Sequence, residues 1–121
     1  MRAITSGELD RMNHVDDNDF VLINVLPREQ FIDKHIRTSV NIPLEDPNFV
    51  QKVEEVAGSK DREVVVYCAS LECNASPKAA QKLEAAGFTH VYDLEGGTRD
   101  WFAYKGQEQS EVPPQRPGQL P

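Results

Sequence analysis

Short apolar runs alternate along the chain with segments in which apolar residues recur at helical spacing. Residues 20–25 are apolar apart from Asn24 and rich in β-branched residues, which predicts a strand buried on both faces. Residues 63–67 predict another strand, with three consecutive valines as its core. Two shorter runs, residues 40–42 and 90–93, predict further strands. Because neighbouring parallel strands are joined by helical crossovers, this alternation predicts an α/β fold with a mainly parallel sheet.

The segments between the predicted strands carry helix start and stop signals. Thr5 and Glu8 have the spacing of a capping box, which predicts a helix that runs to about residue 12. The other predicted helices begin at a proline, a polar N-cap or a glycine turn. They are a short helix that starts at Pro27, one with Asp46 as N-cap and Gly58 as its stop, one with Ser76 as N-cap and Gly87 as its stop, and a last helix after Gly96 and Gly97 that bears Trp101 and Phe102.

The last stretch of the chain differs in composition from the rest. Residues 106–121 hold four of the eight prolines and four glutamines, with Val112 and Leu120 as the only large apolar side chains. Such a segment buries too little surface to offset the entropy of ordering it. The sequence therefore predicts one folded domain over residues 1–105 and a disordered Pro/Gln-rich tail over residues 106–121.

Composition narrows the functional classes. The 121 residues have about the length of one domain, and no apolar run reaches the roughly 18 residues of a membrane span. The net charge of −7 repels phosphate backbones and anionic lipids, which argues against nucleic acid and membranes as partners. The first residues contain no apolar targeting segment, so we expect a cytoplasmic protein. We also expect a monomer.

Cys68 is the first residue after the predicted strand at 63–67, at the edge of a parallel sheet where ligands bind. A helix that begins near Ser76 would place unpaired backbone N–H groups and the positive end of its dipole beside the thiol. Both favour the thiolate, because such surroundings lower a cysteine pKa to between about 3.5 and 7.5. The alternative is that Cys68 is a small apolar residue that ends a buried strand.

Four stretches of the chain resemble the rhodanese homology domain and occur in the order found in that family. They are Val21-Leu22-Ile23-Asn24-Val25; His35-Ile36 followed by Val40-Asn41-Ile42-Pro43; Val64-Val65-Val66-Tyr67-Cys68; and Ala85-Ala86-Gly87-Phe88-Thr89-His90-Val91-Tyr92 with Leu94-Glu95-Gly96-Gly97 and Trp101. The resemblance covers nearly all of residues 4–105. It implies a central, mainly parallel five-stranded sheet flanked by helices on both faces.

The same resemblance implies a chemistry for Cys68. In this family the matching cysteine takes a sulfane sulfur as a persulfide and passes it to a nucleophilic acceptor. The implied partners are a small-molecule or protein-bound sulfane sulfur donor and a thiol acceptor, and no cofactor is implied.

The loop after Cys68 departs from the family pattern. Many rhodaneses have five residues between the cysteine and the serine that starts the helix, whereas this chain has seven: Ala69, Ser70, Leu71, Glu72, Cys73, Asn74 and Ala75. The loop lacks the usual glycine and arginine, and Glu72 gives its side chains a charge of −1. Thiosulfate must then rely on backbone N–H groups, with Lys78 and Arg99 as candidate anion contacts. We expect weak thiosulfate turnover and a neutral or thiol-bound sulfur donor.

Other departures bear on related activities. A loop of seven residues also occurs in cell-cycle phosphatases of this fold, whose motif is Cys-x5-Arg. Asn74 occupies the position of that arginine, so phosphatase activity is not expected. Asn24 and Leu26 stand where the family commonly has Asp and Arg, so a buried ion pair is expected to be missing. His35 and Trp101 are interpreted as packing residues.

Cys73 lies five positions after Cys68, within disulfide reach if the two Cα atoms come within about 7 Å. There it is predicted to attack a persulfide on Cys68, which releases sulfide and leaves a disulfide, or to act as a second sulfur relay. The alternative is that Cys73 is a spectator or a core residue. A Cys-x4-Cys pair does not supply the four ligands of structural zinc, and the three histidines lie on separate segments, so no metal site is expected.

Three functions remain open at this point. The first is a single-domain sulfurtransferase in which Cys68 carries the persulfide, backbone N–H groups of residues 69–75 stabilise it, and Cys73 modulates its release. The second is a redox sensor or sulfur carrier in which both thiols switch between dithiol and disulfide without turnover. The third is a non-catalytic interaction module that presents the acidic surface and the tail to a protein partner.

Overall fold

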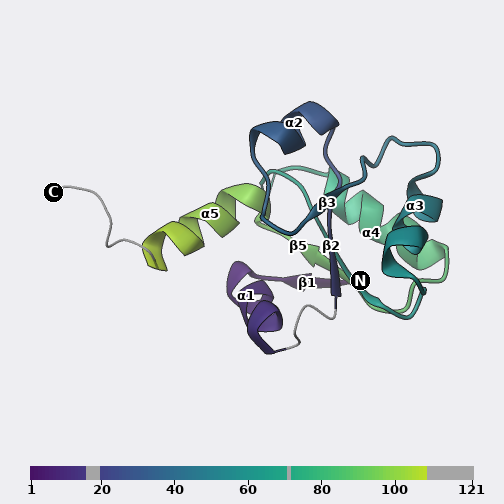
Figure 1. Cartoon of the computed structure of the whole chain (residues 1–121), viewed down its shortest axis with the longest axis horizontal. Helices are drawn as coiled ribbons and strands as arrows, with labels where there is room; N and C mark the ends of the chain where they lie inside the picture. Colours follow the sequence, from purple (N-terminus) through teal and green to yellow (C-terminus); the bar gives the residue numbers. More distant parts are fainter. Residues whose placement is uncertain (16–19, 71, 109–121) are drawn as a thin grey trace, which may run out of the picture.

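The computed structural model describes residues 1–15, 20–70 and 72–108, in which strands and helices alternate (Figure 1). The strands are β1 (Arg2–Ile4), β2 (Phe20–Asn24), β3 (Val40–Asn41), β4 (Glu63–Tyr67) and β5 (Val91–Leu94). The helices are α1 (Ser6–Val15), α2 (Arg28–Asp33), α3 (Phe49–Ala57), α4 (Ala75–Ala85) and α5 (Gly97–Glu108). Within these ranges, no helix is long and apolar enough to cross a lipid bilayer.

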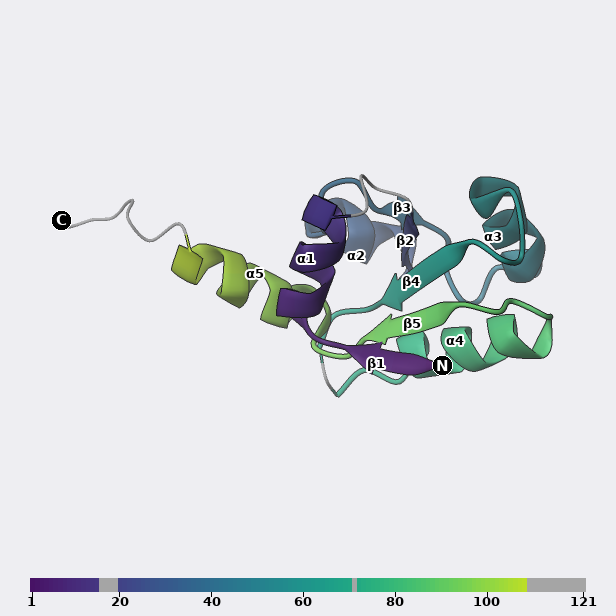
Figure 2. The same ribbon diagram turned by 90° about the horizontal axis from the view of Figure 1, so that it is seen from below.

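The strands form one sheet in the order β1-β5-β4-β2-β3, and every neighbouring pair is parallel. β4 lies in the middle, where Val66 is paired with Ile23 of β2 and with Asp93 of β5. Because the strands are parallel, their carboxyl ends meet at one edge, and the loop after β4 leaves the sheet at that edge (Figure 2). The expected α/β class with a five-stranded parallel sheet is confirmed.

Helices cover both faces of the sheet, because side chains alternate between the faces along each strand. In β4, Val64 and Val66 pack in the apolar cluster formed with α3 and α4. Val65 and Tyr67 pack in a second cluster, formed with α1 and α5. Trp101 of α5 is buried in this second cluster, in agreement with its interpretation as a packing residue. The apolar run of β4 is continuous because both of its faces are covered.

The local signals near the amino terminus are confirmed, whereas the strand before them is not predicted by the sequence pattern. The backbone N–H of Thr5 donates to Glu8 Oε1 (3.0 Å), and the backbone N–H of Glu8 donates to Thr5 Oγ1 (3.1 Å). These two bonds form the capping box. β1 is a three-residue edge strand whose first two residues are exposed, so it leaves no apolar run that would identify it.

Four helix starts differ from the prediction. α2 begins at Arg28, so Pro27 is its N-cap and not its first residue, and α5 begins at Gly97 itself. α3 begins at Phe49, because Asp46 accepts a hydrogen bond from the backbone N–H of Asn48 (2.8 Å) in the turn before the helix. α4 begins at Ala75, one residue before the expected N-cap Ser76. The Ser76 hydroxyl bonds to a side chain of β5 and does not cap the helix. The stop of α3 is confirmed, since Gly58 follows it in the left-handed conformation (φ 82°).

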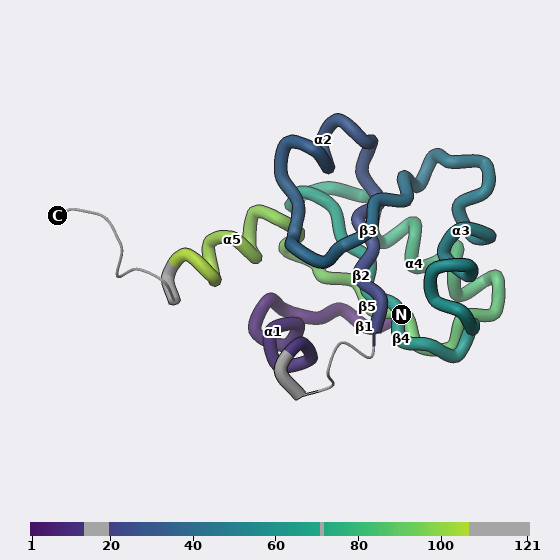
Figure 3. The backbone as a smooth tube through the Cα atoms, viewed as in Figure 1, coloured from purple at the N-terminus to yellow at the C-terminus, as the bar shows by residue number. Residues whose placement is uncertain are grey.

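The last helix is longer than predicted. α5 continues to Glu108, so residues 106–108 belong to a helix and not to the expected tail. Figure 3 shows this helix extending away from the sheet. Residues 109–121, which make up the rest of the expected tail, lie outside the described residues, as does Leu71 of the loop after β4.

Candidate functional site

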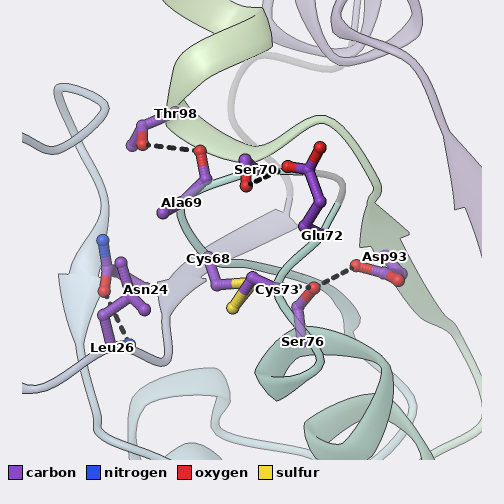
Figure 4. The surroundings of a disulfide bond; sticks show 10 residues. All are labelled: Asn24, Leu26, Cys68, Ala69, Ser70, Glu72, Cys73, Ser76, Asp93 and Thr98. Atoms are coloured by element: carbon purple, nitrogen blue, oxygen red, sulfur yellow. Dashed lines mark hydrogen bonds between the residues drawn. A yellow bond between two sulfur atoms is a disulfide. The ribbon is translucent and has the colours of Figure 1, made fainter.

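The loop that joins β4 to α4 begins at Cys68, at the carboxyl edge of the sheet (Figure 4). Cys68 is only 1% exposed and packs in the apolar cluster that β2 and β4 form with α3 and α4. The burial expected of an apolar residue and the position expected of a nucleophile thus occur together.

The first two residues of the loop are held by the amino-terminal end of α5. The backbone N–H of Thr98 donates to the carbonyl oxygen of Cys68 (2.9 Å), and that of Arg99 donates to the carbonyl oxygen of Ala69 (2.9 Å). This close approach requires Gly97, which has a φ of 63° and where a Cβ atom would lie 2.3 Å from the Cys68 oxygen. The sequence pattern indicates only a turn at this glycine.

Cys68 and Cys73 form a disulfide in this structure, and their Cα atoms are 6.5 Å apart. The distance condition for this pair is therefore met. Cys73 is partly exposed while Cys68 is buried, so the bond links the interior of the site to its surface. The backbone N–H of Cys73 donates to the carbonyl oxygen of Ser70 (3.1 Å). This amide is engaged within the loop, so it does not serve as one of the free N–H groups expected over residues 69–75.

A buried hydrogen-bonded pair lies beside the sulfur of Cys68. Ser76 Oγ is 3.5 Å from Cys68 Sγ and bonds to Asp93 Oδ1 at 2.6 Å (Figure 4). Burial raises the pKa of the Asp93 carboxyl above its ordinary value; the hydrogen bond with Ser76 opposes this rise, and the charge of Glu95 adds to it. Sequence reasoning misses Asp93, although an acidic residue within a short apolar strand is a signal of a buried carboxyl.

Glu72, in the middle of the loop, is exposed. Ser70 Oγ donates to Glu72 Oε1 (3.0 Å). This bond, the backbone N–H of Glu72 and the charge of Arg99 hold the pKa of the Glu72 carboxyl below its ordinary value. An open cavity of about 500 Å³ lies beside the loop, and its charged lining residues are Glu72, Glu95, Arg99 and Asp100. The lining of this cavity, which includes neither Cys68 nor Cys73, is therefore net negative.

The two candidate anion contacts lie in different places. Arg99 lines the cavity beside the loop, whereas Lys78 is exposed on α4 and lies outside the cavity lining. Asn74, at the position of the phosphatase arginine, is exposed immediately before α4. Among residues 1–15, 20–70 and 72–108, no three His, Cys, Asp or Glu side chains are placed to hold a metal ion.

Asn24 supports the backbone at the carboxyl end of β2. Its side chain is fully buried, and its Oδ1 accepts a hydrogen bond from the backbone N–H of Leu26 (2.9 Å; Figure 4). The side chain of Asn41 donates to the carbonyl oxygen of Leu26 (2.9 Å). The side-chain amides of Asn24 and Asn41 thus hold the backbone of Leu26. These uncharged contacts lie in the segment where the sequence predicts that a buried ion pair is missing. His35 is exposed and stacks on the ring of Phe31, which agrees with a packing role.

Comparison with known proteins identifies the same family over most of the chain. The family model described as "Rhodanese-like domain" matches residues 7–104. A curated HTH-type transcriptional regulator from Mycobacterium tuberculosis is 31% identical over 99 residues, which cover 82% of this chain and 41% of that protein. The adenylyltransferase and sulfurtransferase UBA4 of Candida albicans is 36% identical over 86 residues, which cover 67% of this chain and 19% of that protein. The chain thus corresponds to less than half of each relative.

Solved structures with the same fold include both isolated domains and larger enzymes. The rhodanese-like domain of the Alr3790 protein from Anabaena superposes with a TM-score of 0.73 at 28% identity, covering 86% of this chain and 75% of that one. A thiosulfate sulfurtransferase from Pseudomonas aeruginosa superposes with a TM-score of 0.75 over 86% of this chain and 19% of its own. At 21% identity, this second likeness bears on the fold alone.

Proposed function

The chain belongs to the rhodanese-like domain family, and on that premise we propose that it is a sulfurtransferase in which Cys68 carries sulfane sulfur as a persulfide. The observation that carries the proposal is the placement of Cys68 at the carboxyl edge of the parallel sheet, in a loop fixed by α5 and within bonding distance of a second cysteine. A nucleophile at this edge is held in position by the sheet and by the helix that follows β5.

Loading of the site begins from the reduced protein. The thiolate of Cys68 attacks the sulfane sulfur of a thiol-bound persulfide donor, R–S–SH. The S–S bond of the donor breaks, the donor leaves as a thiolate, and Cys68 becomes Cys68–S–SH. An acceptor thiolate then attacks the outer sulfur, becomes a persulfide and releases the Cys68 thiolate.

Cys73 provides a second outcome for the same persulfide. Its thiolate attacks the Cys68 sulfur, expels the outer sulfur as HS⁻ and forms the Cys68–Cys73 disulfide. The disulfide of this structure is the product that such a step would leave. A thiol reductant then returns the protein to the dithiol form.

The charge of the site supports a thiol-bound donor over thiosulfate. The cavity beside the loop carries three carboxylates and one guanidinium, so a dianion approaches against a net negative surface. We therefore propose that thiosulfate loads the protein slowly and that an organic persulfide loads it faster.

A second candidate function is a thiol–disulfide switch, which the disulfide itself favours. Such a switch needs both cysteines and an oxidant, but it needs no sulfane sulfur. The two candidates therefore differ in whether the reduced protein gains a sulfur atom.

Intact mass spectrometry of the reduced protein tests the proposal directly. The protein is exposed to an organic persulfide, to polysulfide and to thiosulfate, as wild type and as the Cys68→Ser and Cys73→Ser variants. We expect wild type and Cys73→Ser to gain one sulfur atom, Cys68→Ser to gain none, and Cys73→Ser to keep its persulfide longer than wild type.

The other outcomes of this experiment are equally informative. If no donor adds sulfur while a mild oxidant links the two cysteines, the switch replaces the sulfurtransferase. If wild type undergoes neither change, the domain is an interaction module whose function does not depend on its thiols.

A further inference from the structure

We propose that Cys68 and Asp93 share one proton through the Ser76 hydroxyl. In this proposal Asp93 is a positioning residue that sets whether the Ser76 hydroxyl accepts from or donates to the Cys68 sulfur. The inference deepens the proposed function and rests on it. It starts from three polar atoms in a row, with 3.5 Å between Cys68 Sγ and Ser76 Oγ and 2.6 Å between Ser76 Oγ and Asp93 Oδ1. The three residues are 1%, 2% and 3% exposed.

The surroundings of Asp93 make its protonation dependent on this chain of contacts. Its register partners on the neighbouring strands are Val66 of β4 and Ala3 of β1, which are apolar. From α4 it meets the Ser76 hydroxyl, and the charged group that acts on it through space is Glu95, the first residue after its own strand. In the part of the chain that the structure describes, no lysine, arginine or histidine pairs with Asp93.

A buried carboxyl without a cation favours its neutral form, and burial raises the pKa of Asp93 accordingly. The charge of the neighbouring sulfur acts in the same direction once the disulfide is reduced. A thiolate at Cys68 and a carboxylate at Asp93 repel each other across Ser76, so the two groups titrate as a coupled pair.

The direction of the hydrogen bonds follows from counting protons, because a serine hydroxyl has only one. When Asp93 is ionised, Ser76 donates to Asp93, and its oxygen accepts from the S–H group of Cys68. When Asp93 is neutral, its O–H donates to Ser76, and the Ser76 proton turns toward the Cys68 thiolate. The first arrangement favours the thiol and the second favours the thiolate.

The two arrangements contain the same number of protons, so one converts into the other without solvent. The S–H bond of Cys68 breaks as a new O–H bond forms on Ser76, and the former Ser76 proton passes to Asp93 Oδ1. The reverse transfer returns the proton when an acceptor removes the outer sulfur and Cys68 departs as a thiolate. The sulfur of Cys68, a residue that is only 1% exposed, thereby has a proton partner within the site.

Titration of the thiolate by its ultraviolet absorbance tests this inference without any sulfur donor. The Cys73→Ser variant leaves Cys68 as the single thiol, and the double variant Cys68→Ser/Cys73→Ser supplies the background. Asp93→Asn and Ser76→Ala are each added to Cys73→Ser, and Glu95→Gln serves as the control that removes a nearby charge without a contact to Ser76.

The two key variants are expected to act in opposite directions. The amide introduced by Asp93→Asn donates to Ser76 as a neutral acid does, so the thiolate midpoint moves to lower pH by about one unit, a tenfold change in the ionisation constant. Ser76→Ala removes the donor to the sulfur while the carboxyl remains, so the midpoint moves to higher pH. Glu95→Gln shifts the midpoint by less than either. If Asp93 and Ser76 had only a structural role, both substitutions would loosen the site. The thiolate midpoint would then shift in the same direction in both variants.

The coupling is also expected in the reverse direction. In carbon-13 spectra, the Asp93 carboxyl of Cys73→Ser should titrate in two steps, one of which disappears in Cys68→Ser/Cys73→Ser. Unchanged thiolate midpoints in both Asp93→Asn and Ser76→Ala, with the fold retained, would overturn the inference. Because neither measurement involves a sulfur donor, such a result leaves the proposed sulfur transfer to be decided by the mass measurement.

Discussion

The loop between β4 and α4 is built differently at its start and in its middle. At the start, the carbonyl oxygens of Cys68 and Ala69 are fixed by backbone N–H groups of α5, and the Cys68 side chain is buried. In the middle, Glu72 is exposed and is held by the Ser70 hydroxyl within the same loop. Main-chain contacts from another element thus fix the reacting sulfur, while side chains within the loop set the charge that a substrate meets. Changes at the start should affect stability and chemistry together, and changes in the middle should affect mainly substrate preference, with only a slight effect on stability.

Gly97→Ala is expected to have the largest effect, because it acts on the start of the loop. The added Cβ would lie 2.3 Å from the Cys68 carbonyl oxygen, and the backbone has a φ of 63°. The alanine must push the start of α5 away from the loop, and it must also adopt a left-handed conformation that an L side chain disfavours. Together these costs should lower the free energy of unfolding by roughly 2 to 5 kcal/mol. Urea denaturation measures this loss, and the variant should also take up less sulfur in the mass measurement.

Gly58→Ala is the matched control for this prediction. Gly58 also has a positive φ, 82°, but a Cβ atom there would meet nothing within 4 Å. Only the conformational cost remains, about 1 kcal/mol. Equal losses in the two variants would show that the contact between Gly97 and the loop carries no additional free energy, which contradicts the comparison between the two parts of the loop.

Glu72→Gln is expected to have a smaller effect, confined to the middle of the loop. The substitution removes one of the three carboxylates that line the cavity, so thiosulfate should load Cys68 about two- to fivefold faster at low ionic strength. The gain should shrink as salt screens the surface, and the free energy of unfolding should hardly change.

Glu55→Gln provides the control for charge, since Glu55 is an exposed residue of α3 that does not line the cavity. It changes the net charge of the chain by the same amount. An equal acceleration in both variants would mean that the total charge, and not the charge of the loop, limits thiosulfate.

The sequence predicts the parts of this site that depend on local patterns. The apolar run of β4 identifies a central strand, and the position of Cys68 directly after it follows from the same pattern. The capping box of Thr5 and Glu8 is recognisable because both partners lie within one turn. The alternation of strands and helices predicts the parallel arrangement of the sheet, and the resemblance to a known family adds the number of strands.

The sequence does not predict contacts between distant elements. Gly97 and the loop after β4 meet because β5 lies beside β4. Cys68 is 29 positions before Gly97, and no pattern near Gly97 in the sequence indicates this contact. Ser76 is interpreted from the sequence as a helix cap, but the sheet places Asp93 within reach of its hydroxyl. The start of the loop is therefore the part that required the structure, because its contacts are tertiary.

Ser70→Ala is expected to have the smallest effect. It tests whether a change in the middle of the loop leaves the start of the loop unaffected. The hydrogen bond from Ser70 is the main reason why the pKa of Glu72 lies below its ordinary value, ahead of the backbone N–H of Glu72 and the charge of Arg99. Its removal should raise the pKa of Glu72 toward the glutamate value of about 4.3.

The sign of the stability effect follows from this shift. A carboxyl whose pKa is lowered by folding stabilises the folded state above its unfolded pKa, and this contribution is lost as the pH falls through the folded pKa. Ser70→Ala should therefore be slightly less stable than wild type at neutral pH, and the difference should vanish in acid. Carbon-13 titration of the Glu72 carboxyl measures the shift, and the Glu8 carboxyl, held by Thr5, is the internal reference in the same spectra. If the pKa of Glu72 is the same in Ser70→Ala as in wild type, the backbone N–H and Arg99 account for its low value. If Ser70→Ala changes the ionisation of Cys68, the two parts of the loop are not independent.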